Sequence, residues 1–224
     1  MRIIVNHLTR MQPGYICVAG IDVSNGRHIR PVLSRRLTTD LLSANGGPFS
    51  LASLIDLGVV EFYGDPPAVE DHLFDPRNVH VIQSLKPEQF WKVLQSVAKK
   101  SILQIFGPAI QLLGRGCVVD KGAGKASLGC LIPAVPPHLY VDNYGKIRIR
   151  VTDGNFTVHL SVTDIRLCET DHQTPKQNLI DQFDTQMRRG ASTILSIGLA
   201  RAWKQPGETI ERHWLQVNNI HLKI

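Results

Sequence analysis

The chain has 224 residues, 43% of them hydrophobic, which is enough to bury one large core or two small ones. This composition excludes a disordered chain, and the longest apolar runs are far shorter than the ~20 residues of a membrane-spanning helix. Lys and Arg outnumber Asp and Glu by 25 to 19, and the resulting net charge of +6 favours polyanionic partners, nucleic acid first.

The N-terminal segment MRIIVNHLTR begins like a strand and becomes polar at its sixth residue. It lacks the long apolar core and the small-residue cleavage site of a secretory signal. We therefore expect a cytoplasmic protein without membrane association.

The spacing of cysteines and histidines offers no metal module. Zinc modules place their ligands close together in sequence, because short loops preorganise the tetrahedron. The four cysteines are far apart, and the nine histidines form no HxH or HExxH arrangement. We expect reduced, mostly buried thiols, no metal and no cofactor. The cysteines are Cys17, Cys117, Cys130 and Cys168.

Short strands separated by turns make up most of the first half of the chain. Residues 2–5 open a strand, and residues 59–62 form another. Asn25-Gly26 predicts a tight turn that joins strands at residues 15–23 and 27–32, since primed turns require positive φ.

Two amphipathic helices are predicted. Pro87 suits the first turn of a helix that continues to Gly107-Pro108, with an apolar face containing Leu94 and Ile102. A second helix runs over residues 174–189 and ends before Gly190. Its buried stripe is Leu179, Ile180, Phe183 and Met187.

The second half begins with a glycine-rich segment, residues 114–129, and a strand at residues 128–133. Residues 146–162 alternate between apolar and polar on both sides of Asp153-Gly154, the pattern of a hairpin with a two-residue turn. Strands at residues 193–200 and 213–222 close the chain. The expected hairpin pairs are Arg150 with Thr157, Arg148 with His159, and Lys146 with Ser161.

Many short strands with few helices favour β-barrels or sandwiches over a parallel βαβ sheet. Strands followed by a helix occur about twice along the chain. We therefore predict an α+β fold, mainly β, in two domains, residues 1–112 and 113–224.

The segment KGAGK at residues 121–125 is not a phosphate loop. That motif needs a glycine where Val119 stands and Ser or Thr where Ala126 stands. A flexible basic loop remains, whose Lys121 and Lys125 can contact a phosphate backbone.

No catalytic constellation is identified. There is no GxSxG elbow, and the carboxylates stand at strand ends and turns, where Asp serves the backbone. A metal-dependent nuclease would need converging carboxylates and a lysine, so it remains the less favoured alternative. The carboxylates concerned are Asp22, Asp56, Asp153 and Asp164.

The cationic face of the 146–162 hairpin is the candidate nucleic-acid site. Alternate residues on a strand lie ~6.5–7 Å apart, so Lys146, Arg148 and Arg150 can follow the phosphates of a stretched single strand. Tyr144 lies beside them and can stack on a base. A solvated sheet face with ordinary charges is the alternative. Further candidate contact residues are Arg27, Arg30, Arg35, Arg36, Lys121, Lys125, His159, Arg201 and Trp203.

The segments HLTRMQPGYICVAGID, GRHIRPV, GKIRIRVTDGNFTVHLSVTDIRL, LSIGLARAW and HWLQVNNIHL together resemble the dual OB-containing domain family of bacteria and archaea. The resemblance covers essentially the whole chain. It implies two OB-like barrels and nucleic-acid binding in defence or mobile-element systems. It supplies no catalytic residues.

We therefore predict a non-enzymatic protein that binds nucleic acid, single strands in preference to duplexes, on basic sheet faces. The alternative is a protein-interaction or scaffold subunit that uses apolar strand edges or the two helices.

Overall fold

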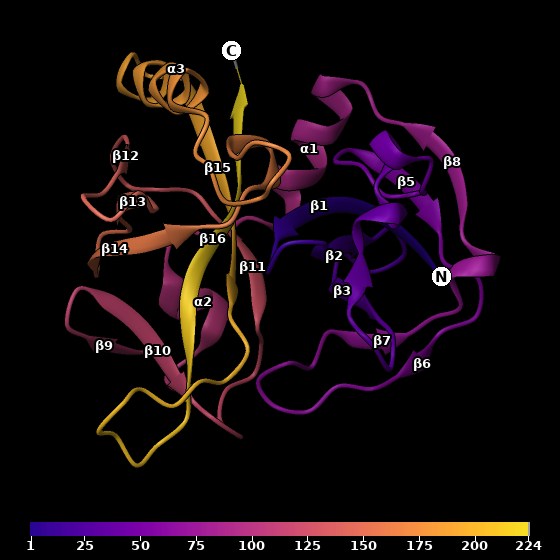
Figure 1. Ribbon diagram of the computed structural model, residues 1–224, viewed down its shortest axis with the longest axis horizontal. Helices are drawn as coiled ribbons and strands as arrows, with labels where there is room; N and C mark the ends of the chain where they lie inside the picture. Colours follow the sequence, from indigo (N-terminus) through magenta and orange to yellow (C-terminus); the bar gives the residue numbers. More distant parts are fainter. Residues whose placement is uncertain (224) are drawn as a thin grey trace.

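The computed structural model describes residues 1–223 and folds them into two curled sheets, consistent with two OB-like barrels (Figure 1). Residues 2–84 supply one sheet (indigo to magenta) and residues 111–223 the other (magenta to yellow). The predicted fold class, mainly β with a few helices, is confirmed. Within residues 1–223, no helix has the length and apolar character needed to cross a membrane.

The first sheet has the strand order β6-β7-β3-β2-β1-β5-β8, with β4 paired to β2. The period-two pattern of β1 places Ile3 and Val5 in its core, where they pack with Val18, Phe49 and Ile55. The strands are β1 (Arg2–Arg10), β2 (Tyr15–Asp22), β3 (His28–Val32), β4 (Leu37–Thr38), β5 (Ser53–Asp56), β6 (Glu61–Phe62), β7 (Asp71–Leu73) and β8 (His80–Ser84).

The second sheet has the order β11-β15-β16-β14-β13-β12, and β10 pairs with both β16 and β9. The apolar face of the predicted hairpin lies in its core, with Ile147, Ile149, Val158 and Leu160 almost fully buried. The strands are β9 (Gln111–Leu113), β10 (Gly116–Asp120), β11 (Leu128–Leu131), β12 (His138–Val141), β13 (Ile147–Thr152), β14 (Thr157–Val162), β15 (Ser192–Leu199) and β16 (Arg212–Lys223).

The hairpin of β13 and β14 forms as predicted, but the predicted register is wrong. Arg150 lies opposite His159 and Arg148 opposite Ser161, and the loop comprises residues 153–156. The shift is two residues, so each side chain keeps its predicted face and only its partner changes.

The longer loop follows from the side chain of Asp153. Its Oδ1 accepts hydrogen bonds from the backbone N–H of Asn155 (2.9 Å) and Phe156 (2.7 Å), which closes an Asx turn. Its Oδ2 accepts from the N–H of Ile102 (2.6 Å) at the start of a helix. A carboxylate with these partners cannot occupy the centre of a two-residue turn.

The predicted continuous helix after Pro87 is also wrong. The chain forms α1 (Pro87–Val97) and α2 (Ile102–Phe106), because Lys99 between them is extended and pairs with the end of β11. The N–H of Lys99 donates to the carbonyl of Cys130, and its own carbonyl accepts from Ile132, both at 2.8 Å. The other helices are α3 (Gln177–Arg188) and the 3-10 turns η1 (Thr39–Leu41), η2 (Ser43–Asn45), η3 (Pro76–Asn78) and η4 (Ile165–Leu167).

Buried polar side chains join the two sheets. Asn219 of β16 is fully buried and hydrogen-bonds both the N–H (2.6 Å) and the carbonyl (3.1 Å) of Leu8 in β1. The buried carboxylate of Glu70 accepts from the N–H and hydroxyl of Ser127 (2.8 and 2.6 Å) and from the N–H of Leu128 (3.2 Å). These bonds fix the relative position of the strands that line the cleft described below.

The predicted division after residue 112 stays a prediction. The buried side chains of α2, Ile102, Ile105 and Phe106, belong to the hydrophobic core of the second sheet. Helix α1 packs through Trp91 and Leu94 on a small cluster that draws residues from both sheets.

Candidate nucleic-acid interface

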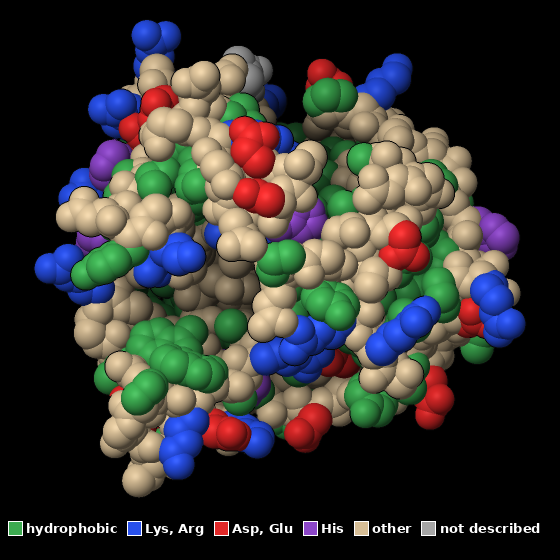
Figure 2. Space-filling view, viewed as in Figure 1, with side chains coloured by type: hydrophobic (Ala, Val, Ile, Leu, Met, Phe, Trp, Pro, Cys, Tyr) green, Lys and Arg blue, Asp and Glu red, His purple; other side chains and the backbone are tan. Residues whose placement is uncertain are grey.

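A cleft of about 850 Å³ lies where the two sheets meet. Residues from β1, β2, β3 and the β3–β4 loop line one side, and residues around β11, β15 and β16 line the other. Among the described residues of its lining there are five arginines and neither Asp nor Glu. Figure 2 shows Lys and Arg side chains (blue) gathered near the middle of one face of the molecule. The arginines of the cleft are Arg10, Arg30, Arg35, Arg36 and Arg201.

Arg30 is the buried member of this set. It is 5% exposed, and its Nε donates to the equally buried Asp71 of β7. The second oxygen of Asp71 accepts from Nη2 of Arg201 at 3.2 Å. The Arg201 side chain is still 64% exposed. One carboxylate behind the wall of the cleft thus orients two guanidinium groups without neutralising both.

Arg35 and Arg36 are exposed in the β3–β4 loop. The guanidinium of Arg36 lies 5.4 Å from the ring centroid of Tyr15, a cation–π contact, and also bonds the side chain of Gln12. These contacts hold the Arg36 side chain over the first barrel while its charge stays in solvent.

Arg10 at the end of β1 completes the set and was missed from the sequence. Its guanidinium donates to the carbonyls of His172 (3.1 Å) and Val162 (3.5 Å), which belong to the second half of the chain. Its Nε is buried without a partner. The one local signal was its place directly before the Met11–Gly14 turn.

The outer face of β12, β13 and β14 is a second cationic surface. Arg150 is exposed there, between His138 of β12 and His159 of β14. Tyr140 of β12 stacks on His138, with ring centroids 5.3 Å apart, and its hydroxyl lies 2.8 Å from Nδ1 of His159. The hairpin has no aromatic residue on this face, but the neighbouring strand β12 supplies one.

Two of the predicted contact residues on this face, Arg148 and His159, are engaged by neighbouring side chains. Nε of Arg148 donates to Asp142 (2.9 Å), and its Nη1 bonds Ser161. Burial and the nearby Arg115 and Arg150 lower the pKa of His159. Of the predicted trio Lys146, Arg148 and Arg150, the last two lie within β13. Arg148 is engaged by Asp142 and Ser161, so Arg150 is the strand cation left for a phosphate.

The other predicted residues lie outside the lining of the cleft. Lys146 and Tyr144 are exposed in the β12–β13 turn, and Arg27 is exposed between β2 and β3. Lys121 pairs with Glu211. The remaining two, Lys125 and Trp203, are exposed in loops.

A family model described as the dual OB-containing domain matches residues 1–220. The chain belongs to the dual OB-containing domain family. This confirms the resemblance found in the sequence. No curated protein matches the chain.

OB folds bind oligonucleotides on an exposed sheet face between loops. In this dual OB-containing protein the walls of the cleft carry residues from the first and the second sheet.

The carboxylates considered for nuclease chemistry serve the backbone, as predicted. Asp22 accepts from the N–H of Ser24, Asp56 from Gly58, and Asp153 from Asn155. Asp164 is fully buried and accepts from the N–H of Arg166 and Ile220. Each of them is committed to a turn or a strand end.

All four cysteines are free thiols, and three of them are buried. Burial raises the pKa of Cys117 and Cys130 to about 12. A thiol of this pKa is a poor nucleophile at neutral pH, so neither residue has the setting of a catalytic cysteine.

Proposed function

We propose that this dual OB-containing protein binds single-stranded nucleic acid without catalysing a reaction. The supporting observation is the inter-sheet cleft, with five arginines and no carboxylate among the described residues of its lining. Guanidinium groups bind phosphate oxygens bidentately and release condensed counterions. The exposed Arg35, Arg36 and Arg201 contact successive phosphates, and the buried Arg30 orients the floor of the site.

The dimensions of the cleft favour a single strand. Its volume of about 850 Å³ matches sites for small molecules, so it admits a few nucleotides in an extended chain. A duplex presents its phosphates on the outside of a wide rod, which does not enter such a concavity. Exposed apolar lining residues such as Met11 and Pro13 give the bases a surface on which to rest.

Fluorescence anisotropy with labelled single-stranded and duplex DNA and RNA, at two salt concentrations, tests this proposal. Single strands are expected to bind more tightly than duplexes. The logarithm of the binding constant is expected to fall with the logarithm of salt concentration by ~0.7 for each phosphate contacted. A binding constant that does not change with salt concentration, or no binding to any of the four probes, would overturn the proposal.

The outer face of β12, β13 and β14 supplies a secondary contact in this proposal. The paired change Arg148→Ala and Arg150→Ala is expected to weaken single-strand binding about three- to tenfold, with most of the loss due to Arg150. The fold is retained because both side chains point away from the core. Anisotropy measures the loss, and unchanged affinity would assign this face to ordinary solvated charge.

An edge strand supports the scaffold alternative. All five residues of β8 are exposed, including Val81 and Ile82 at 52% and 45%, and among the strands of residues 1–223 β8 pairs with β5 alone. A free apolar edge can accept a strand from another protein. Absence of oligonucleotide affinity in the titration, together with binding of a partner lost on Val81→Lys, would favour this function.

A further inference from the structure

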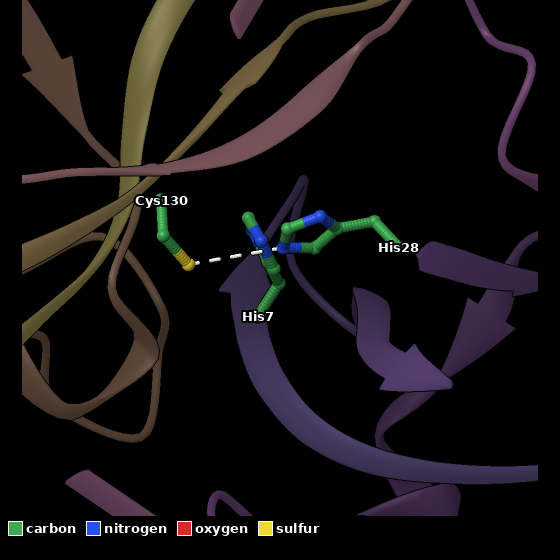
Figure 3. Close-up of side chains that lie close together, drawn as sticks. All are labelled: His7, His28 and Cys130. Carbon is green, nitrogen blue, oxygen red and sulfur yellow. Dashed lines mark hydrogen bonds between the residues drawn. The ribbon is translucent and has the colours of Figure 1, made fainter. Parts of the chain in front are cut away.

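Three potential metal ligands converge inside the seam between the two sheets. His7 of β1, His28 of β3 and Cys130 of β11 each place a ligand atom within 4.8 Å of the other two (Figure 3). Figure 3 shows both imidazole rings and the Cys130 sulfur directed toward one another. It is the sole cluster of at least three His, Cys, Asp or Glu ligands found within residues 1–223.

The separation of Cys130 and His28 suits a tetrahedral zinc-type ion. Sγ of Cys130 lies 3.8 Å from Nε2 of His28. Zn–S of ~2.3 Å and Zn–N of ~2.05 Å at a tetrahedral angle require an S–N separation of about 3.6 Å. The two imidazole rings meet edge to face, with centroids 5.2 Å apart, so neither blocks the other.

Unpaired buried atoms around the cluster indicate a missing partner. Nε2 of His7 has no hydrogen-bond partner although the residue is 1% exposed. The side-chain oxygens of Asn6 and Asn218 are buried and unpaired in the same seam. The amide nitrogen of Asn6 lies 3.3 Å from Nε2 of His28 and 3.2 Å from Sγ of Cys130. Buried polar groups in folded proteins are nearly always satisfied, so several such atoms at one place call for an explanation.

A metal ion on Nε2 of His7 accounts for two of these atoms together. Metal binding there leaves the proton on Nδ1, which needs an acceptor. Nδ1 of His7 lies 3.0 Å from the side-chain amide of Asn218. Rotation of that amide turns its unpaired oxygen toward the Nδ1 proton. The hydrogen bond to Asn218 then fixes the orientation of the His7 ring.

We propose that His7, His28 and Cys130 bind a divalent zinc-type ion that fastens the first barrel to the second. His7 and His28 belong to the first sheet and Cys130 to the second, so the ion cross-links the two walls of the seam. The fourth position falls to Asn6, because rotation of its amide exchanges the nitrogen beside His28 and Cys130 for its unpaired oxygen. The sequence predicted no metal because the ligands are scattered, with His28 and Cys130 separated by 102 residues.

The test is the metal content of the full chain, purified with zinc and dialysed against metal-free buffer. Wild type is expected to retain one zinc ion per chain, and Cys130→Ser and His28→Gln to lose it. The matched controls Cys117→Ser, a buried thiol outside the cluster, and His80→Gln, an exposed histidine, keep the ion. With Co²⁺ alone, wild type shows thiolate-to-cobalt absorption in the near ultraviolet, which is absent from Cys130→Ser.

Thermal melting keeps the test independent of misfolding. Zn²⁺ added to metal-free wild type is expected to raise its Tm, while Cys130→Ser melts cooperatively with no response to zinc. If Cys130→Ser does not fold, the more conservative His28→Gln carries the comparison. Wild type that retains no zinc and shows no change of Tm, or a Cys130→Ser variant that binds zinc as well as wild type, overturns the proposal.

Discussion

The triple variant Arg35→Ala, Arg36→Ala and Arg201→Ala is expected to bind a single-stranded oligonucleotide about a thousandfold more weakly than wild type at low salt. Each lost arginine–phosphate contact costs about 1.4 kcal/mol, a factor of ten, and the three contacts are exposed enough to be nearly additive. Fluorescence anisotropy at matched salt measures the difference.

The matched control removes the same charge elsewhere. Lys92, Lys99 and Lys100 are exposed on and just after α1 and do not line the cleft. Their replacement by alanine is expected to change affinity less than tenfold, since only the diffuse attraction to phosphate is reduced. Equal losses in the two variants would show that net charge, and not the cleft, carries binding. Thermal melts of both variants confirm that the fold is intact.

The second large effect concerns the hydrogen bonds of Glu70 to Ser127 and Leu128, which join the two sheets. Glu70→Ala is expected to lower the free energy of unfolding by about 3–5 kcal/mol, because two buried N–H groups and one hydroxyl lose their acceptor. Denaturant unfolding measures this loss. The control Glu61→Ala, at an exposed position of β6, is expected to stay within about 0.5 kcal/mol of wild type. A loss below about 1 kcal/mol for Glu70→Ala would contradict the view that these hydrogen bonds stabilise the contact between the sheets.

The same carboxyl predicts a pH dependence. Burial raises the pKa of Glu70, against the opposing effect of its hydrogen bonds to Ser127. The folded state then binds more protons than the unfolded state above the ordinary carboxyl pKa. The stability contributed by this group therefore falls as pH rises from the ordinary carboxyl pKa to the raised pKa of Glu70 in the folded state. Glu70→Gln keeps an acceptor oxygen, so it is expected to destabilise less than alanine and to flatten this dependence.

Local patterns were enough to predict much of the fold. Alternation at Ile147, Ile149 and Val158 identified the core face of the β13–β14 hairpin. The register depended on the Asp153 carboxylate, which also bonds Ile102 at the start of α2, 51 residues away. The break between α1 and α2 likewise depended on pairing of Lys99 with β11. Both details arise from tertiary contacts that no short window of sequence contains.

The candidate site was only partly accessible from the sequence. Basic residues of the first hairpin and its following loop were expected to contact nucleic acid, and Arg30, Arg35 and Arg36 line the cleft. Arg30 is buried against Asp71, which is 41 residues away in sequence. Arg10 contacts His172, which is 162 residues away. Charge can be counted along a chain, but the place where charges converge is set by topology.

Photo-crosslinking with an oligonucleotide that carries 5-bromodeoxyuridine, followed by mass spectrometry, tests the cleft most directly. Binding between the two sheets brings bases against Met11, Cys17 and His213, three reactive side chains of its lining. Crosslinks are expected at these residues and absent after the triple arginine substitution. Crosslinks confined to Tyr140 and Tyr144, on and beside the outer face of the second barrel, would contradict the assignment of the cleft as the binding site.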